Sequence, residues 1–248
     1  AKYPNVYTLH SMAADGSDIV TMSYHDLPEY NPSVDHDGKI VYTRWDYYDK
    51  ASHWTGNMWL TNPDGRDPRS MHGNYFLPHQ TFDRSLPSGK GTGMGNPQME
   101  QGIRAVPGSP GYYTATVSAV HGGERGSLVL INVKKEDDYG MGQVSRLTPE
   151  IVFPESEWYS MQYGLGDKVY GYCWPLDRDF YLCSYGRNIY YLDRFGNREL
   201  IVAFEEVPGA REGLVDPIPL GPRPKPPVFP WRPMKGGATS CPIRRPQS

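Results

Sequence analysis

The chain has 248 residues, 38% of them hydrophobic, and its 25 Lys and Arg against 28 Asp and Glu give a formal net charge of -3. This length can bury a substantial core, and the charge excludes the strongly basic field that is typical of nucleic-acid-binding proteins. The 19 Tyr, 27 Gly and 24 Pro suit strands and turns. Because no stretch shows helical periodicity or an apolar run as long as a membrane span, we expect an all-β protein with no membrane span.

Residues 5–24 predict one β-hairpin. An inner strand leads into the turn Ala14 to Ser17, and an outer strand runs from Asp18 to Tyr24. The Asp-Gly pair inside the turn is a hairpin signal, since glycine adopts positive φ without steric cost. We interpret this hairpin as the second half of a four-stranded unit.

The stretch from residue 30 to residue 74 is the most regular part of the sequence. It predicts an entry strand at 31–34, an alternating strand at 40–45, a third strand at 58–61 and a polar fourth strand that ends near residue 74. Two of the turns between these strands contain Asp-Gly, which again indicates tight hairpins. Two hairpins in series form a β-meander, the unit that repeats as the blade of a β-propeller.

Two further units follow. Residues 75–98 are rich in Gly and Pro and predict a long loop, but not a phosphate-binding loop, because the lysine is misplaced for that motif. The later units span 100–149 and 158–204. Together with the half blade and the regular unit, they predict an all-β partial β-propeller of about three and a half four-stranded blades within residues 1–204. So few blades cannot close a ring, and we expect an exposed apolar edge.

Residues 205–248 predict a proline-rich linker. Proline fixes φ and removes a backbone donor, so the stretch favours extended chain that runs across a surface towards another domain. Its basic residues are spread among the prolines, which indicates a solvated linker and no nucleic-acid contact. Because the chain begins with Ala1 and the first predicted strand begins a few residues later, we expect it to be a piece of a longer protein.

The three cysteines, Cys173, Cys183 and Cys241, lack the spacing of a metal or haem site. Cys173 and Cys183 fall on neighbouring strands of one predicted hairpin, which allows a cross-strand disulfide. Two buried thiols on strands are the alternative that the sequence favours.

One candidate ligand site follows the second strand of the regular unit. Arg44, Trp45 and Asp46 precede a loop that contains His53 and Trp54. An arginine beside aromatic rings can bind an anionic or sugar-like ligand by paired hydrogen bonds and stacking. The alternative, which we favour, is an Arg–Asp pair that locks adjacent blades. For a ligand, we expect contacts in the loop between residues 46 and 57.

Loop histidines are the candidates for a metal site, because neutral imidazole is a common ligand. They are His53, His72, His79 and His121. His121 also stands at a predicted strand end, where it could contact a ligand. No two of them have the short spacing of a metal motif, so ordinary hydrogen-bonded histidines are favoured. The sequence contains no Cys-x-x-Cys-His motif, so it predicts no c-type haem, and no cofactor is identified.

Four stretches resemble proteins like the alpha subunit of hydrazine synthase, in particular its non-haem relatives, and the turns resemble those of TolB-type periplasmic propellers. The stretches are YNPSVDHDGKIVYTRWDYYD, IRAVPGSPGYYTATVSAVHGG with GSLVLIN, WPLDRDFYLCSY with NIYYLDRFGNREL, and DPIPLGPRPKPP. The resemblance implies an N-terminal β-propeller, six-bladed in the whole protein, in a periplasmic or secreted protein. No haem ligand carries over to this chain.

Two functions stay open at this point. The first is a non-catalytic propeller module that scaffolds, or binds partners or ligands, within a larger extracytoplasmic protein, whose other domains or subunits are its partners. The second is an enzyme module, either a redox subunit of a multi-haem assembly or a sugar-active propeller. The sequence favours the first, because it contains no convincing catalytic set, although propellers host many functions.

Overall fold

The computed structural model describes residues 6–46, 56–73, 97, 99–119, 123–136, 142–154, 168–211 and 213–222. In these residues the regular structure is β-strand, with one 3-10 turn, η2, at Phe204–Glu206. The all-β prediction is therefore confirmed. Within the same residues, no helix has the length and apolar character needed to cross a membrane.

The chain begins with a short hairpin. Strands β1 (His10–Ser11) and β2 (Val20–Thr21) have two residues each and form a sheet of their own. They are shorter than the sequence predicts, although the turn is where it was expected. Gly16 has φ 83° and its amide donates 2.9 Å to Ala13 O.

Meander 1 consists of β3 (Glu29–Val34), β4 (Ile40–Trp45), β5 (Gly56–Thr61) and β6 (Arg69–Ser70). Each strand pairs antiparallel with the next. The second strand has the predicted bounds, and the last strand is shorter than predicted. The N-terminal hairpin packs on this meander through Leu9 and Met22, which contact Tyr42.

Two more meanders follow with the same strand order. Meander 2 contains β7 (Met99–Ala105), β8 (Tyr112–Ser118), β9 (Gly126–Asn132) and β10 (Val144–Arg146). Meander 3 contains β11 (Tyr170–Pro175), β12 (Phe180–Tyr185), β13 (Asn188–Asp193) and β14 (Arg198–Val202). In both, successive strands pair antiparallel.

The entry strands β3, β7 and β11 share a local irregularity. Each has a register shift against its second strand, between Tyr30 and Ser33, between Gln101 and Arg104, and between Tyr170 and Cys173. Asn31 (φ 49°) and Gly102 (φ 60°) take left-handed backbone at this point. A bulge re-aims the side chains around it, so all three entry strands direct residues out of the regular alternation at the same place.

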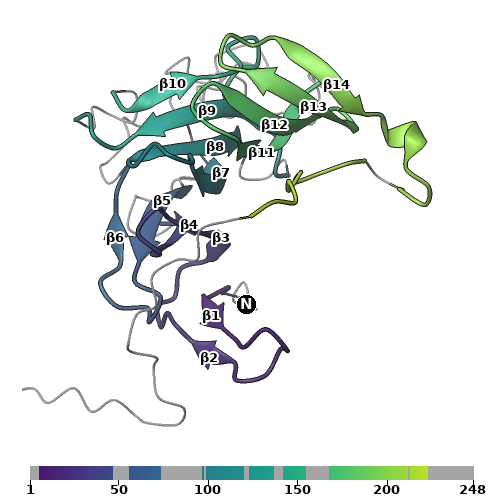
Figure 1. Ribbon diagram of the computed structural model, residues 1–248. Helices are drawn as coiled ribbons and strands as arrows, with labels where there is room; N and C mark the ends of the chain where they lie inside the picture. The colour runs from purple at the N-terminus through teal and green to yellow at the C-terminus, as the bar shows by residue number, and fades with distance from the viewer. Residues whose placement is uncertain are drawn as a thin grey trace, which may run out of the picture.

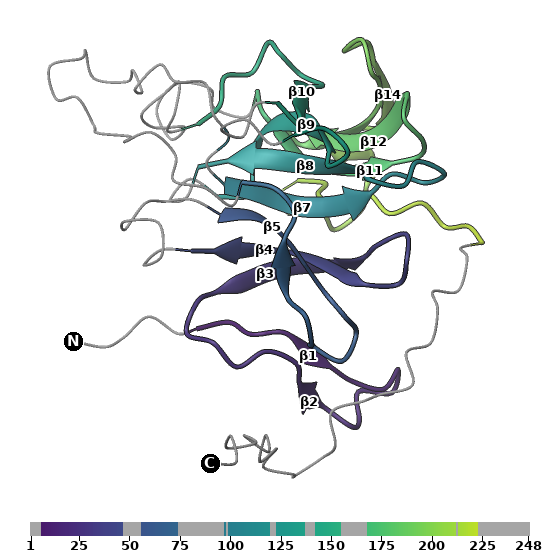
Figure 2. The same ribbon diagram turned by 90° about the vertical axis from the view of Figure 1, so that its left-hand side faces the viewer.

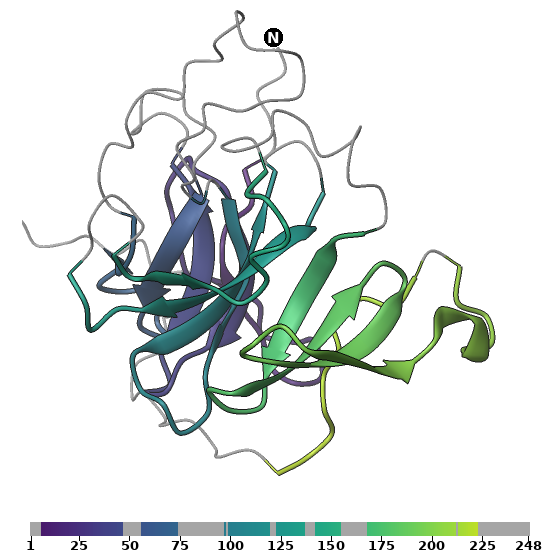
Figure 3. The ribbon, with the colours of Figure 1, turned by 90° about the horizontal axis from the view of Figure 1, so that it is seen from above.

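The meanders are joined mainly by side-chain packing. Among the described residues, one backbone pair links β5 to β7, Gly56 with Met99, and one links β9 to β11, Gly126 with Tyr170. One core cluster combines meanders 1 and 2, and another combines meanders 2 and 3. Figures 1 and 2 show hairpin β1–β2, meander 1 and meander 2 in successive layers. Seen from above, meander 3 extends to one side of the others (Figure 3), and among the described residues the array does not close into a ring.

The chain after β14 turns back towards the entry strands. Residues 213–222, here called the strap, cross beneath β11 and run towards β3 (yellow in Figure 1). The amide of Leu214 donates 2.9 Å to Arg187 O, and Asp216 Oδ1 lies 2.6 Å from an Arg104 guanidinium nitrogen. The prediction of extended chain across a surface applies to this part, and the surface is that of meanders 2 and 3.

Candidate functional site

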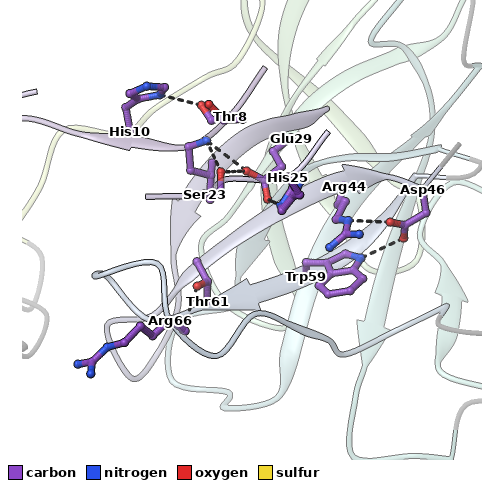
Figure 4. A network of polar contacts seen from close by, with 11 residues as sticks. Thr8, His10, Ser23, His25, Glu29, Arg44, Asp46, Trp59, Thr61 and Arg66 are labelled. Carbon is purple, nitrogen blue, oxygen red and sulfur yellow. Dashed lines mark hydrogen bonds and ion pairs between the residues drawn. The ribbon is translucent and has the colours of Figure 1, made fainter. Parts of the chain in front are cut away.

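The predicted Arg44–Asp46 pair exists and includes a tryptophan that sequence analysis did not single out. Arg44 Nε lies 2.7 Å from Asp46 Oδ1, and Trp59 Nε1 donates 3.3 Å to Asp46 Oδ2. The Arg44 guanidinium carbon lies 4.2 Å from the centre of the Trp59 ring (Figure 4). Both oxygens of the buried carboxylate therefore bind groups of β4 and β5. These contacts stay within one meander, whereas the favoured interpretation of the sequence places the pair between adjacent blades. Trp45 stands opposite Gly56, and side-chain alternation directs it to the other face.

A second polar group in the same view joins the N-terminal hairpin to β3. The Glu29 carboxylate accepts hydrogen bonds from the Leu9 amide (3.1 Å) and from Ser23 Oγ, and its other oxygen lies 2.6 Å from His25 Nε2 (Figure 4). Serine and histidine both bind the carboxylate here, whereas a catalytic triad needs the histidine between the other two. The arrangement fixes the hairpin and activates no nucleophile.

Tyr42 lies beside this group, and burial, followed by the charge of Glu29, raises the pKa of its hydroxyl. The hydroxyl is therefore neutral at physiological pH. A neutral buried phenol acts as a hydrogen-bonding partner within the core, where Tyr42 is 1% exposed.

His72, a predicted metal candidate, is buried between meanders 1 and 2. Its Nδ1 lies 2.6 Å from Gln143 Oε1 and its Nε2 lies 2.9 Å from Glu100 Oε1. The Gln143 amide nitrogen donates to Lys135 O, which directs the amide oxygen at the ring and places a hydrogen on Nδ1. Both ring nitrogens are thus used in joining the two meanders, so metal binding would require breaking one of these bonds.

The other candidates, His53, Trp54, His79 and His121, lie outside the described residues, as does most of the loop between residues 46 and 57. In the part of the chain that the structure describes, no three His, Cys, Asp or Glu side chains come close enough together to hold a metal ion.

The two strand cysteines are buried thiols. Cys173 and Cys183 face each other across β11 and β12 and are not bonded to each other. Burial raises the pKa of the Cys173 thiol well above its usual range, and burial raises that of Cys183 to about 12. The favoured alternative of the sequence analysis is confirmed for this pair, and the cross-strand disulfide is not formed.

The bulged entry strands bring together a polar group that sequence analysis missed. This Arg104 cluster consists of Asn31 on β3, Arg104 on β7, Tyr172 and Trp174 on β11, and Asp216 on the strap. The Arg104 guanidinium carbon lies 4.5 Å from the centre of the Trp174 ring while one of its nitrogens binds Asp216. Asn31 Nδ2 donates 2.8 Å to Tyr172 Oη. Three meanders and the strap thus contribute to one cluster.

Close packing holds the Tyr172 ring in place. A Cβ on Gly102 would lie 2.5 Å from Tyr172 Cδ1, so the bulge glycine lets the ring lie against β7. Burial, followed by a hydrogen bond to Glu124, raises the pKa of the Tyr172 hydroxyl. That hydroxyl therefore stays protonated and can both donate and accept.

The cluster has unused hydrogen-bonding capacity. Arg104 Nε and Asn31 Oδ1 are buried and have no hydrogen-bond partner among the described residues. A guanidinium stacked on an indole face can bind a carboxylate in two-point geometry. Asp216 uses one nitrogen of that fork. The geometry is that of a carboxylate-binding cluster.

A signal for this cluster is present in the sequence, although it is weak. Gly102 interrupts a strand, and an isolated glycine in a strand indicates a bulge or a close approach. Arg104 stands two residues later in an otherwise apolar run. The third element, Asp216, is 112 residues away, and nothing in the sequence pairs it with Arg104.

Comparison with known proteins gives little. No family model matches the sequence, and no curated protein matches it. Among solved structures, the chain is similar to Kuenenia stuttgartiensis hydrazine synthase, with 18% identity, a TM-score of 0.46, and coverage of 70% of this chain and 19% of that chain. The chain spans about a fifth of that protein's length.

Proposed function

We propose that this chain is a non-catalytic, β-propeller-type module that scaffolds other domains or subunits of a larger protein. Support for the propeller type comes from three four-stranded meanders that pack face to face and carry the same bulge in the same strand pair. An extracytoplasmic location is part of the proposal, and it rests on the resemblance seen in the sequence.

The observation that carries the scaffold role is the distribution of exposed apolar side chains. In the described residues, meander 2, with a neighbouring sheet on each side, has no exposed large hydrophobic side chain, whereas both ends of the array have several. At the hairpin end they are Val6, Tyr7, Met12, Ile19 and Tyr24, and in meander 3 they are Phe180, Phe195, Leu200 and Ile201. Exposed apolar patches of this kind mark surfaces that bind other proteins.

The end sheets are therefore where partners would bind. Ile19 is 61% exposed and Ile201 is 52% exposed, so a partner can contact either side chain without any rearrangement of the core. Packing against a further sheet would bury these side chains as the meanders bury theirs in the two interfaces of the array. The partners implied are β-sheets or other apolar faces of the same assembly.

Light scattering on the 248-residue chain tests the proposal. We expect self-association that rises with protein concentration, and Ile19→Glu with Ile201→Glu should suppress it. Val34→Glu is the matched control, because Val34 is 49% exposed but belongs to meander 1. A single monomeric species at all concentrations, or equal effects of the control and the double variant, would overturn the scaffold role of the ends.

A further inference from the structure

We propose that the Arg104 cluster is a binding site for an extended acidic peptide, and that the strap occupies it as an internal ligand. The site concerns a different surface from the open ends of the array and does not depend on the scaffold role. The observation behind it is that Asp216, on the strap, is held by Arg104, which is stacked on Trp174.

The strap is bound in the manner of a peptide ligand and not as part of the core. Three of its four large apolar side chains are exposed: Val215 is 60% exposed, Ile218 is 51% exposed and Leu220 is fully exposed, whereas Leu214 is half-buried. What fixes the strap is polar, namely the amide of Leu214 on Arg187 O and the carboxylate of Asp216 on Arg104. A segment held by polar contacts of this kind at the surface can be released without opening a core.

Two arginine guanidinium groups lie along the strap. Beside Gly213 lie an Arg125 guanidinium nitrogen and the Arg187 backbone, 3.6 Å and 3.5 Å from the position of an added Cβ. The guanidinium group of Arg187 instead lies over the Phe204 ring, 3.5 Å from its centre. Arg104 and Arg125 are therefore the arginines whose charged groups lie along the strap, which contributes one carboxylate to them. A peptide with more acidic residues would therefore complement the surface better than the strap does.

The chain geometry also favours an extended ligand. Asp216 lies at a bend, and Pro217 and Pro219 follow it. The prolines fix φ at two positions, so the part of the segment after the bend is pre-set in extended form at low entropic cost. Arg104 Nε and Asn31 Oδ1 are both buried and have no hydrogen-bond partner among the described residues. The first can donate to an extended peptide ligand, and the second can accept from it. A single small carboxylate would use only the first of them.

The internal strap has a regulatory consequence. Because the strap is tethered, it competes at a high effective concentration with any peptide that arrives from outside. The site is therefore masked in the isolated chain, and an external acidic segment binds only where it outcompetes the strap or where the strap is drawn away. Release of Asp216 also relaxes its left-handed backbone, φ 47°, which non-glycine residues adopt at a cost.

Fluorescence anisotropy on the 248-residue chain tests the site. The probe is a labelled peptide with the sequence of residues 213–221, GLVDPIPLG. We expect the Asp216→Asn chain to bind it at least about tenfold more tightly than the wild type, because the internal competitor is weakened. Binding should weaken with added salt, and the double variant Arg104→Gln with Asp216→Asn should lose it.

Two controls distinguish the carboxylate contact from non-specific peptide binding. Asp179→Asn removes an exposed ion pair with Arg194, 3.3 Å long, and should bind the probe like the wild type. A probe with Asn in place of Asp should not bind the Asp216→Asn chain. Equal binding of the two probes, or full displacement of the probe by succinate at the same concentration, would overturn the peptide site.

Hydrogen exchange gives a second readout that does not depend on the double variant folding. In the Asp216→Asn chain, the Leu214 amide, which donates to Arg187 O, should exchange faster than in the wild type. In the Asp179→Asn chain, its exchange should be unchanged. Unchanged exchange in Asp216→Asn would show that the ion pair does not hold the strap, and it would overturn the role of the strap as a competitor.

Discussion

Gly65→Ala is the substitution that best tests how the N-terminal hairpin is held. Gly65 lies in the turn between β5 and β6 with φ 80°, and an added Cβ would lie 1.9 Å from Met22 O. No real Cβ approaches a backbone oxygen so closely, so the hairpin must move away from the turn. Met22, now 6% exposed in the cluster with Leu9 and Tyr42, would lose that contact.

Gly16→Ala is the matched control. Gly16 has nearly the same conformation, φ 83°, but nothing lies within 4 Å of its Cβ position. Both variants bear the cost of a left-handed alanine, about 1 kcal/mol. Gly65→Ala also loses much of the burial of one methionine, roughly 1.5–3 kcal/mol. We therefore expect the free energy of unfolding to fall by about 1 kcal/mol for Gly16→Ala and by about 2.5–4 kcal/mol for Gly65→Ala.

Urea denaturation followed by far-ultraviolet circular dichroism measures both values, and the Tm should shift about three times further for Gly65→Ala. Equal losses in the two variants would refute the reasoning, because they would show that the contact between the Gly65 turn and Met22 does not stabilise the protein. A normal Gly65→Ala protein with a disordered hairpin, seen as fast amide exchange in residues 6–24, would support the packing but show that the hairpin unfolds independently.

Three further predictions concern buried groups. His72→Ala should lower the free energy of unfolding by roughly 3–5 kcal/mol, because it removes the imidazole that pairs with the buried Glu100 carboxylate; a loss below about 1 kcal/mol in urea denaturation would contradict a buried pair. Because the pKa of Cys183 is raised by burial to about 12, about one thiol in ten thousand is ionised at pH 8. Iodoacetamide should therefore leave Cys183 unmodified until urea unfolds the chain, and mass spectrometry of the native protein would reveal the opposite. Burial raises the pKa of Asp64, but hydrogen bonds from Arg66 outweigh it and hold that pKa below its ordinary value. Its contribution to stability is thus present above the unfolded pKa, near about 4, and lost as pH falls through the folded pKa. Asp64→Asn should flatten the fall in Tm between neutral pH and pH 2.5, and an unchanged slope would show that the carboxylate is not held.

Local chemistry explains why the meanders could be predicted. In the turn before β6, Asp64 accepts from the Arg66 amide while Gly65 supplies positive φ, and both requirements are met by neighbouring residues. The alternating run 40–45 likewise contains all that decides which face is buried. Where the cause of a structure lies within a few residues, the sequence displays it.

The N-terminal hairpin shows how a distant group changes a local expectation. The sequence predicts long strands on both sides of Gly16, yet β1 and β2 have two residues each. The Leu9 amide donates to Ser23 Oγ and to the Glu29 carboxylate, so side chains take a donor that a strand ladder would have used. Tyr7 O accepts from the Glu29 amide, which ties the same segment to β3.

The two Arg–Trp–Asp groups of this chain show which contacts can be predicted from the sequence and which cannot. Arg44 and Asp46 are two residues apart and Trp59 lies across one hairpin, so the pair was visible as a candidate before the structure. Arg104, Trp174 and Asp216 have the same composition and similar stacking, 4.5 Å against 4.2 Å, but come from two meanders and the strap.

The difference in their surroundings decides what each can do. The Asp46 carboxylate is 2% exposed and both its oxygens bind the same hairpin, so removing it would take away the side-chain contact that links Arg44 to Trp59. The Asp216 side chain is 34% exposed and stands on a segment in which Val215, Ile218 and Leu220 are exposed. The Arg44 group is therefore structural, because all its residues belong to one hairpin. In the Arg104 group, the carboxylate is exchangeable, because it stands on a strap that the core does not hold.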